Sequence, residues 1–217
     1  MAQELDFSRS RLTTPRAAAV AGILFSVLYM TVIILIRSSV PENPEEMGDW
    51  LSTGWRSVQL ALNLLPFAGI AFLWFIGVVR DRLGQHEDRF FATVFFGSGL
   101  LFLAMLFASA ALAGGLLTMY GTNPAQLIVS GIYTYGRMVT YELMNVYTLK
   151  MAGVFMLSMS TLSLRTGIVP RWLAILGFLL ALFLILSLGL IVWAPIVFPL
   201  YILMISIYIL IANYRRS

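Results

Sequence analysis

Long apolar runs alternate with short polar segments along this 217-residue chain. Most of these runs have about the 20 residues that a helix needs to cross the hydrocarbon core of a bilayer. We therefore predict an all-α, polytopic membrane protein with six transmembrane helices in three hairpins, forming a single membrane domain over residues 1–217. The predicted transmembrane helices cover about residues 16–37, 57–79, 90–118, 139–164, 172–193 and 196–213. The first run has no small-residue cleavage site after it, which favours a retained helix over a signal peptide.

Two of the connecting segments open with an Asn-Pro pair, at residues 43–44 and 123–124. Asparagine is a good N-cap residue, and proline suits the first position of a helix. In the first segment Trp50 and Trp55 share one helical face, and tryptophan prefers the headgroup level of a bilayer. We expect one or two short interfacial helices on the outer side, the first of them over residues 44–55.

The basic residues are distributed unequally between the two sides of this predicted bundle. Ten arginines lie on the side of the two termini, and three, Arg37, Arg56 and Arg137, lie on the other side. Cytoplasmic segments of membrane proteins carry the excess of arginine and lysine. Both termini are therefore predicted to be cytoplasmic.

Composition sets further bounds on what the chain can be. Hydrophobic residues make up 60% of it and charged residues only 11%. A soluble domain carries about 25% charged residues, so this chain needs lipid to cover its apolar surface. The arginines behind the net charge of +4 stand singly at helix ends, which indicates no nucleic-acid partner. Because the sequence has no cysteine, disulfides and thiolate metal sites are excluded.

Three polar side chains interrupt the predicted helix 139–164, namely Glu142, Asn145 and Lys150. At 100° per residue they fall within an arc of about 140° on one face. Ionisable side chains at bilayer depth are costly unless they are paired or hydrated, so they are candidates for a functional site. Lys150 is the only lysine in the chain, so its position inside an apolar run is hard to attribute to chance.

The predicted helix 57–79 enters the membrane from the same outer side and carries two amides, Gln59 and Asn63, on one face. These amides and the polar groups of the helix 139–164 lie at matching depth, with an arginine at the rim above each helix. We predict a polar path between the two helices. Its candidate residues are Arg56, Gln59, Asn63, Arg137, Glu142, Asn145 and Lys150.

Two other interpretations of these residues stay open. Glu142 and Lys150 could form a buried ion pair that locks helix packing, with Asn63 and Asn145 as interhelical hydrogen-bond partners. Glu142 could also lie near enough to the interface to be merely solvated. The functional hypothesis differs from both, because it needs a wet cavity beside the two charges.

No catalytic or cofactor motif accompanies these polar residues. The predicted helices contain no histidine, and the sequence has neither H-E-x-x-H nor G-x-S-x-G. We therefore predict a non-enzymatic protein without a metal ion or a cofactor.

The two outer segments and the helices after them resemble each other. Each passes from Asn-Pro to an arginine that begins a helix, with an asparagine about two turns further on, Asn63 in one and Asn145 in the other. This pattern suggests a parallel hairpin repeat of residues 16–80 and 90–165, as some transporters show. Asn-Pro is also a common loop opening, so chance similarity stays an alternative.

The segment between the predicted fourth and fifth helices reads R-T-G-I-V-P-R-W-L-A-I-L-G, from Arg165 to Gly177. It resembles a G-x-x-P-R-W-L-x-x-x-G loop found in uncharacterised bacterial multi-pass membrane protein families. The resemblance implies a location in the bacterial cytoplasmic (inner) membrane, and it implies no activity. In physical terms Pro170 stops one helix, and Trp172 anchors the next at the interface.

The leading functional prediction is a small transport or channel-type protein that moves a small ion or polar solute along the path. The alternative is a structural or accessory subunit that binds lipids or a larger membrane complex. Besides the lipid bilayer, we expect a second copy of the chain or such a complex as a partner, because six helices leave little interior for a path.

Overall fold

The computed structural model describes residues 14–41, 50–83, 89–187 and 191–214. These residues form helices and connecting turns with no strand among them, which confirms the all-α prediction. In chain order the elements are α2 (Thr14–Ser39), α3 (Leu51–Leu83), α4 (Arg89–Thr122), α5 (Pro124–Val129), α6 (Ile132–Glu142), the π-helical turn η2 (Leu143–Tyr147), α7 (Thr148–Thr166), α8 (Arg171–Leu186), the 3₁₀ turn η3 (Ala194–Ile196) and α9 (Val197–Tyr214).

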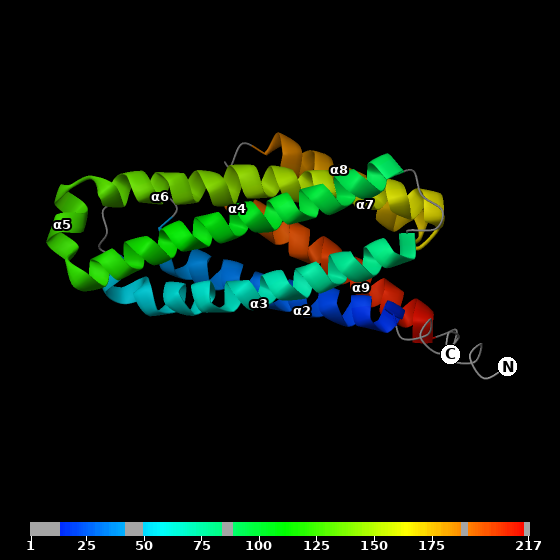
Figure 1. Ribbon diagram of the computed structural model, residues 1–217, viewed down its shortest axis with the longest axis horizontal. Helices are drawn as coiled ribbons and strands as arrows, with labels where there is room; N and C mark the ends of the chain where they lie inside the picture. The colour runs from blue at the N-terminus through cyan, green and yellow to red at the C-terminus, as the bar shows by residue number, and fades with distance from the viewer. Residues whose placement is uncertain (1–13, 42–49, 84–88, 188–190, 215–217) are drawn as a thin grey trace.

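The long helices run side by side along the longest axis and alternate in direction (Figure 1). Helix α2 begins and α9 ends at one end of the bundle, which we call the terminal end; α5 lies across the other, which we call the α5 end. Helix α2 packs on α3 and α9, α4 packs on α3 and α7, and α7 packs on α8. Helices α6 and α7 continue each other through η2 as one long rod.

Four helical segments of the described residues are long and apolar enough to cross a membrane, at 17–39, 51–80, 90–122 and 194–214. They identify a membrane protein. The other two predicted spans differ from expectation, since α8 has only 16 residues and the predicted helix 139–164 is divided by the π-helical turn. Four of the six predicted crossings therefore correspond to helices that are long and apolar enough to cross a membrane, and six crossings stay a prediction.

Several predicted boundaries move. Helix α3 begins at Leu51, so residues 51–55 belong to it rather than to an interfacial helix, and residues 42–49 lie outside the described part. The second short helix is confirmed as α5. The side-chain oxygen of Asn123 accepts a 3.3 Å hydrogen bond from the backbone N–H of Gln126. Helix α8 ends at Leu186, seven residues before the predicted end, where Ser187 adopts an extended conformation.

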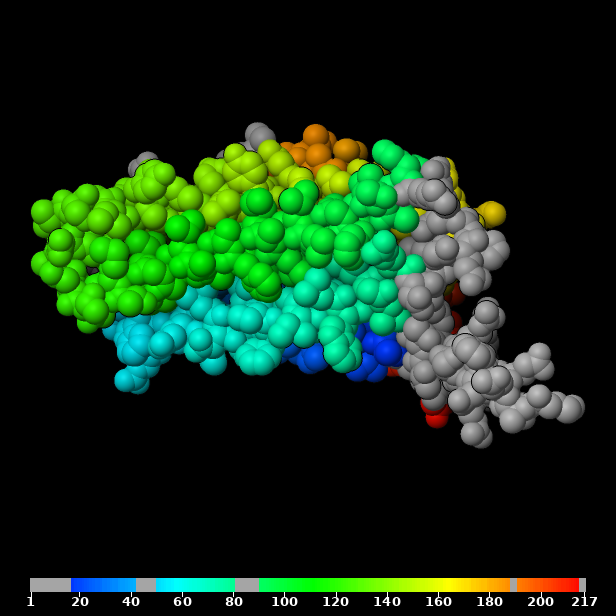
Figure 2. All heavy atoms as spheres, in the orientation of Figure 1, coloured from blue at the N-terminus to red at the C-terminus, as the bar shows by residue number. Residues whose placement is uncertain are grey.

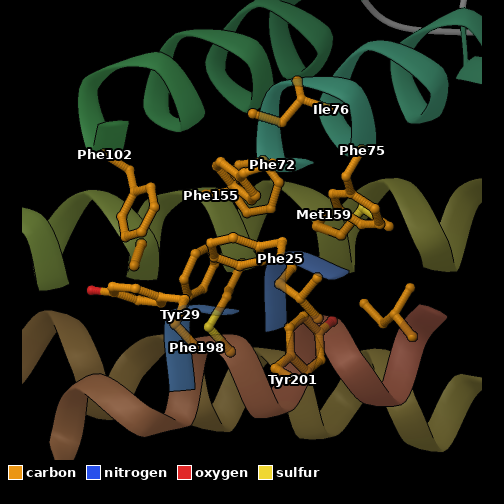
Figure 3. Packing of buried hydrophobic residues seen from close by; sticks show 14 of the residues in the cluster. Phe25, Tyr29, Phe72, Phe75, Ile76, Phe102, Phe155, Met159, Phe198 and Tyr201 are labelled. Carbon is orange, nitrogen blue, oxygen red and sulfur yellow. The ribbon is translucent and has the colours of Figure 1, made fainter. Parts of the chain in front are cut away.

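The core is centred on a layer of phenylalanines, one each from α2, α3, α4, α7 and α9 (Figure 3). This aromatic layer consists of Phe25, Phe72, Phe102, Phe155 and Phe198, all at most 1% exposed. Ring centroids lie 4.6 Å apart for Phe25 and Phe72, and 5.2 Å apart for Phe72 and Phe155. Such pairs add about 0.5–1.5 kcal/mol each beyond the burial of their surface. The layer ties five helices together near the middle of the molecule.

Apolar side chains also cover the outside of the bundle, where a soluble protein would carry polar groups. Leu24 on α2, Phe67 on α3 and Leu179 on α8 are all at least half exposed. Exposed tryptophans stand at the two ends of α8, Trp172 in its first turn and Trp193 in the segment between α8 and α9. This pattern is typical of a lipid-facing surface with aromatic residues at the interfaces.

Candidate functional site

A partly open cavity of about 110 Å³ lies between α2, α3, α4 and α6, toward the α5 end. Its charged lining groups within the described residues are Arg37 and Arg137, and Asn145 lies with them. We call it the arginine cavity. Most of its wall is apolar and includes Ile36, Val58, Leu62, Leu65, Leu106, Ala110, Ala113 and Leu116. Cationic groups thus meet hydrocarbon walls in one space.

Arg37, in the last turn of α2, donates a 2.5 Å hydrogen bond from Nη2 to the side-chain oxygen of Asn145. Asn145 is only 3% exposed, and its amide nitrogen donates to the carbonyl of Tyr141 at 3.0 Å. The asparagine therefore links a cation on α2 to the backbone of the α6–α7 rod. A bond to a charged donor stabilises by about 1.5–3 kcal/mol, more than a neutral one.

The position of Asn145 depends on the π-helical turn that contains it. Thr148 donates its hydroxyl to the carbonyl of Leu143, five residues earlier, at 2.6 Å. A π-helical turn inside an α-helix adds a residue to one turn, and such turns occur often at functional sites. The extra residue changes the angle between the faces of α6 and α7, so that Asn145 points inward.

Arg137, on α6, is 7% exposed and lines the arginine cavity on the side of α6. It donates to the Pro41 carbonyl at 2.9 Å and to the Tyr133 hydroxyl at 3.2 Å. The Trp50 indole donates to the same hydroxyl at 2.7 Å, and the guanidinium lies 6.0 Å from the centre of its ring. This cluster joins the segment after α2 and the start of α3 to α6.

The height of each group follows from its separation from the aromatic layer. Asn145 precedes Phe155 by ten residues, about 15 Å along the helix, and Arg37 follows Phe25 by twelve, about 18 Å. Arg137 lies about 27 Å from the layer on the same side. On the terminal side Arg165 is ten residues from Phe155, again about 15 Å. The aromatic layer is therefore midway between two levels of polar groups.

A second cavity, of about 370 Å³, lies between α3 and α4. Gln59 and Asn63 line it together with Thr118. We call it the amide cavity. It shares two lining residues, Leu62 and Leu117, with the arginine cavity, so the two spaces adjoin.

The structure therefore places the residues of the predicted polar path in two different cavities or outside both. Gln59 and Asn63 face α4, in the amide cavity, whereas Arg137 and Asn145 line the arginine cavity. Helix α4 packs against both α3 and the α6–α7 rod, so the two amides of α3 and the polar groups of the rod line different cavities, although other residues of α3 share the arginine cavity with the rod. The physical reason is the position of α4, which sequence periodicity does not reveal.

The other predicted site residues line neither cavity. Glu142 is exposed on the outside of the rod, and Lys150 is half-buried about 12 Å further along it. No ion pair between them occurs in the described part of the chain. Arg56 is exposed and lies 5.6 Å from the ring of its neighbour Trp55. In the described ranges no three histidine, aspartate or glutamate side chains come together as a metal site.

Sequence reasoning did not include Arg37 in the site, although a signal for it was present. Arg37, Arg56 and Arg137 were the three arginines on the side that carries few. An arginine on the side that carries few basic residues is better explained by a specific contact than by membrane topology. Two of the three line the arginine cavity.

Comparison of the chain with known protein families, with curated proteins and with solved structures found no match. The resemblance of the segment 165–177 to bacterial membrane families stays a prediction. The functional argument therefore depends on the geometry of the site.

Proposed function

We propose that this protein binds an anionic lipid, whose headgroup contacts Arg37 and Arg137 and whose acyl chain enters the apolar part of the arginine cavity. The observation that supports this most is the gradient of polarity inside one cavity. Leu106 and Leu65 line its lower part, about 6 and 10 Å from the aromatic layer, while the two arginines line its upper part.

The membrane position that we infer places this gradient across an interface. A hydrocarbon core is about 30 Å thick, so with the aromatic layer at its centre the boundaries fall about 15 Å to either side. Arg37 and Asn145 then lie at one boundary and Arg165 at the other. Arg137 lies about 9 Å further from the aromatic layer than Arg37 does. The headgroup layer outside the hydrocarbon core is about 5–7 Å thick, and it lies between the two arginines.

In this placement six helices cross the membrane, although α8, with 16 residues, is about 24 Å long and so shorter than the hydrocarbon core of about 30 Å. The excess of arginines at the terminal end makes that end cytoplasmic. The arginine cavity then opens at the outer leaflet, in a bacterial inner membrane if the loop resemblance holds.

Arginine is the side chain best suited to the ligand proposed. Its planar guanidinium presents five N–H donors in a fork that matches phosphate and carboxylate oxygens. The low dielectric of a largely apolar cavity strengthens such a contact relative to water. A free soluble anion would gain nothing from the apolar walls, whereas a lipid fills both parts of the cavity.

The test measures binding of phosphatidylglycerol to the full-length protein in detergent by native mass spectrometry. Arg37→Gln and Arg137→Gln should each weaken binding about 10- to 100-fold, the effect of losing one charged hydrogen bond. Arg56→Gln is the matched control, because it removes the same charge on the same side without touching the arginine cavity.

Phosphatidylcholine, which carries no net charge, should bind the wild type weakly. If all three arginine variants lose affinity equally, the attraction is a general surface effect and the site is wrong. If the wild type does not distinguish the two lipids, the proposal fails.

Transport along a path at Glu142 and Lys150 stays a second hypothesis without a supporting observation of its own. It requires water beside both residues, and neither lines the arginine cavity or the amide cavity. A second copy of the chain, a larger complex, and a small ion or polar solute likewise stay predicted partners.

A further inference from the structure

The amide cavity has the chemistry of a site for hydroxyl groups. Its lining among the described residues contains no charged side chain, but it contains the amides of Gln59 and Asn63 and the hydroxyl of Thr118. A side-chain amide both donates and accepts hydrogen bonds. Two amides therefore suit a ligand whose oxygens also donate and accept hydrogen bonds, as hydroxyl oxygens do. That description fits an alcohol, a glycerol or a sugar better than a second phosphate, which would lack a cationic partner here.

The amides make no hydrogen bond to another residue that the structure describes. Asn63 lies nine residues from Phe72, about 14 Å from the aromatic layer and so at the inferred hydrocarbon boundary. A polar group at this depth is costly when nothing pairs with it. Both amides are exposed, so a hydrogen-bonding group from outside the chain can pair with them here.

Two further acceptors belong to residues that line the same space. Thr118 donates its hydroxyl hydrogen to the Gly114 carbonyl at 2.9 Å, which leaves the oxygen as an acceptor. Pro66, inside α3, has no N–H, so the carbonyl of Leu62 four residues earlier lacks its usual helical partner. Leu62 lines both cavities, so this carbonyl belongs to a residue of their common wall.

We propose that the amide cavity binds the hydroxyl groups of a lipid headgroup whose phosphate is held in the adjoining arginine cavity. This inference rests on the proposed function and names its ligand more closely. The ligand is an anionic phospholipid with a polyhydroxyl headgroup, such as glycerol. Because Leu62 and Leu117 line both cavities, the two spaces adjoin, and we infer that one headgroup contacts both.

The experiment compares phosphatidylglycerol with phosphatidylethanol of the same acyl chains, by titration of the full-length protein in native mass spectrometry. Both lipids carry one negative charge, and only the first has headgroup hydroxyls. The wild type should prefer phosphatidylglycerol about tenfold, as expected for one or two hydrogen bonds.

Asn63→Leu and Gln59→Leu should each remove most of this preference and leave phosphatidylethanol binding unchanged. Thr118→Val, which keeps the shape of the side chain, should reduce the preference in the same way. Gln126→Leu is the matched control, because Gln126 is an exposed amide on α5 that lines neither cavity.

The possible outcomes separate the two claims. Equal binding of the two lipids by the wild type overturns this inference and leaves the proposed function intact. A preference that survives in Asn63→Leu and Gln59→Leu also overturns it. Failure to bind either lipid overturns the proposed function instead. Equal affinity for the deacylated headgroup, glycerophosphoglycerol, overturns the assignment to a lipid in favour of a soluble ligand.

Discussion

Replacing Asn145 with leucine removes the side chain that joins α2 to the π-helical turn. Two hydrogen bonds are lost, one from Arg37 at 2.5 Å and one to the Tyr141 carbonyl at 3.0 Å. The bond to the charged donor contributes about 1.5–3 kcal/mol and the neutral one about 0.5–1.5 kcal/mol. Burial of the leucine returns roughly 1 kcal/mol. The net loss should be about 2 kcal/mol, or about a thirtyfold change in the unfolding equilibrium.

The assay is equilibrium unfolding in mixed micelles of dodecyl maltoside and sodium dodecyl sulfate, followed by far-ultraviolet circular dichroism. Asn63→Leu is the control, because Asn63 is exposed and makes no bond to a described residue. An exposed substitution of this kind changes stability by about 0.5 kcal/mol or less. The two asparagines occupy equivalent places in the predicted repeat, so the comparison isolates the effect of burial.

A double-mutant cycle with Arg37→Met identifies which bond carries the effect. If the 2.5 Å bond dominates, the two substitutions should couple by about 1.5 kcal/mol or more. Additivity within about 0.5 kcal/mol would show that the two side chains act independently. In that case the inference that this bond joins α2 to the rod would be wrong, whatever the total loss of stability.

Three other predictions concern the packing, the predicted path and the topology. Gly153→Ala should destabilise by about 1–3 kcal/mol in the same assay, since the new methyl lies 3.0 Å from a carbonyl oxygen of α8, whereas Gly97→Ala, with open space around it, should not. Lys150→Met should leave lipid affinity unchanged, and ion flux in liposomes that disappears with this variant would support a conducting path instead. Because the chain has no cysteine, Thr122→Cys and Thr166→Cys are single labelling sites: an impermeant maleimide added to intact cells should reach only the first.

Sequence periodicity predicted the helices well where polar residues or proline interrupt an apolar run. Asn123 and its proline gave α5, and the Ala-Pro pair at 194–195 gave the break before α9. The end of α8 at Leu186 could not be predicted, because the apolar run continues to Trp193 without a polar residue after Ser187. In such a run hydrophobicity marks burial in lipid and carries no information about where the helix stops.

The candidate site was predicted in part, and the reason lies in what a single helix can show. Spacing of 100° per residue groups side chains of one helix, which related Asn145 to Glu142 and Lys150. The π-helical turn alters that spacing locally, so Asn145 turns inward and Glu142 outward. The partner of Asn145 is Arg37, which precedes it by 108 residues and which only the packing of α2 against the bundle brings near.

The two cavities follow from the unequal lengths of the helices. Helices α3 and α4, with 33 and 34 residues, are each about 50 Å long, whereas α8, with 16, is about 24 Å long. The α5 end is accordingly built from α3, α4, α5 and α6 on the visible face, and α8 does not reach it (Figure 2). Fewer helices surround the axis there, and α4 contributes the small side chains of Ser109, Ala110 and Ala113 to the cavity wall.

A bundle that only had to hold itself together would fill this space with larger side chains, since each unfilled methyl-sized void costs about 1 kcal/mol. Here the space is instead lined with arginines whose bonds fix their positions at the level where we propose an outer headgroup layer. Open volume, apolar walls and cationic groups coincide at the one depth where a lipid offers a phosphate above its acyl chains. That coincidence is what distinguishes lipid binding from a packing defect, and filling the volume with Ala113→Phe should therefore abolish binding without loss of stability.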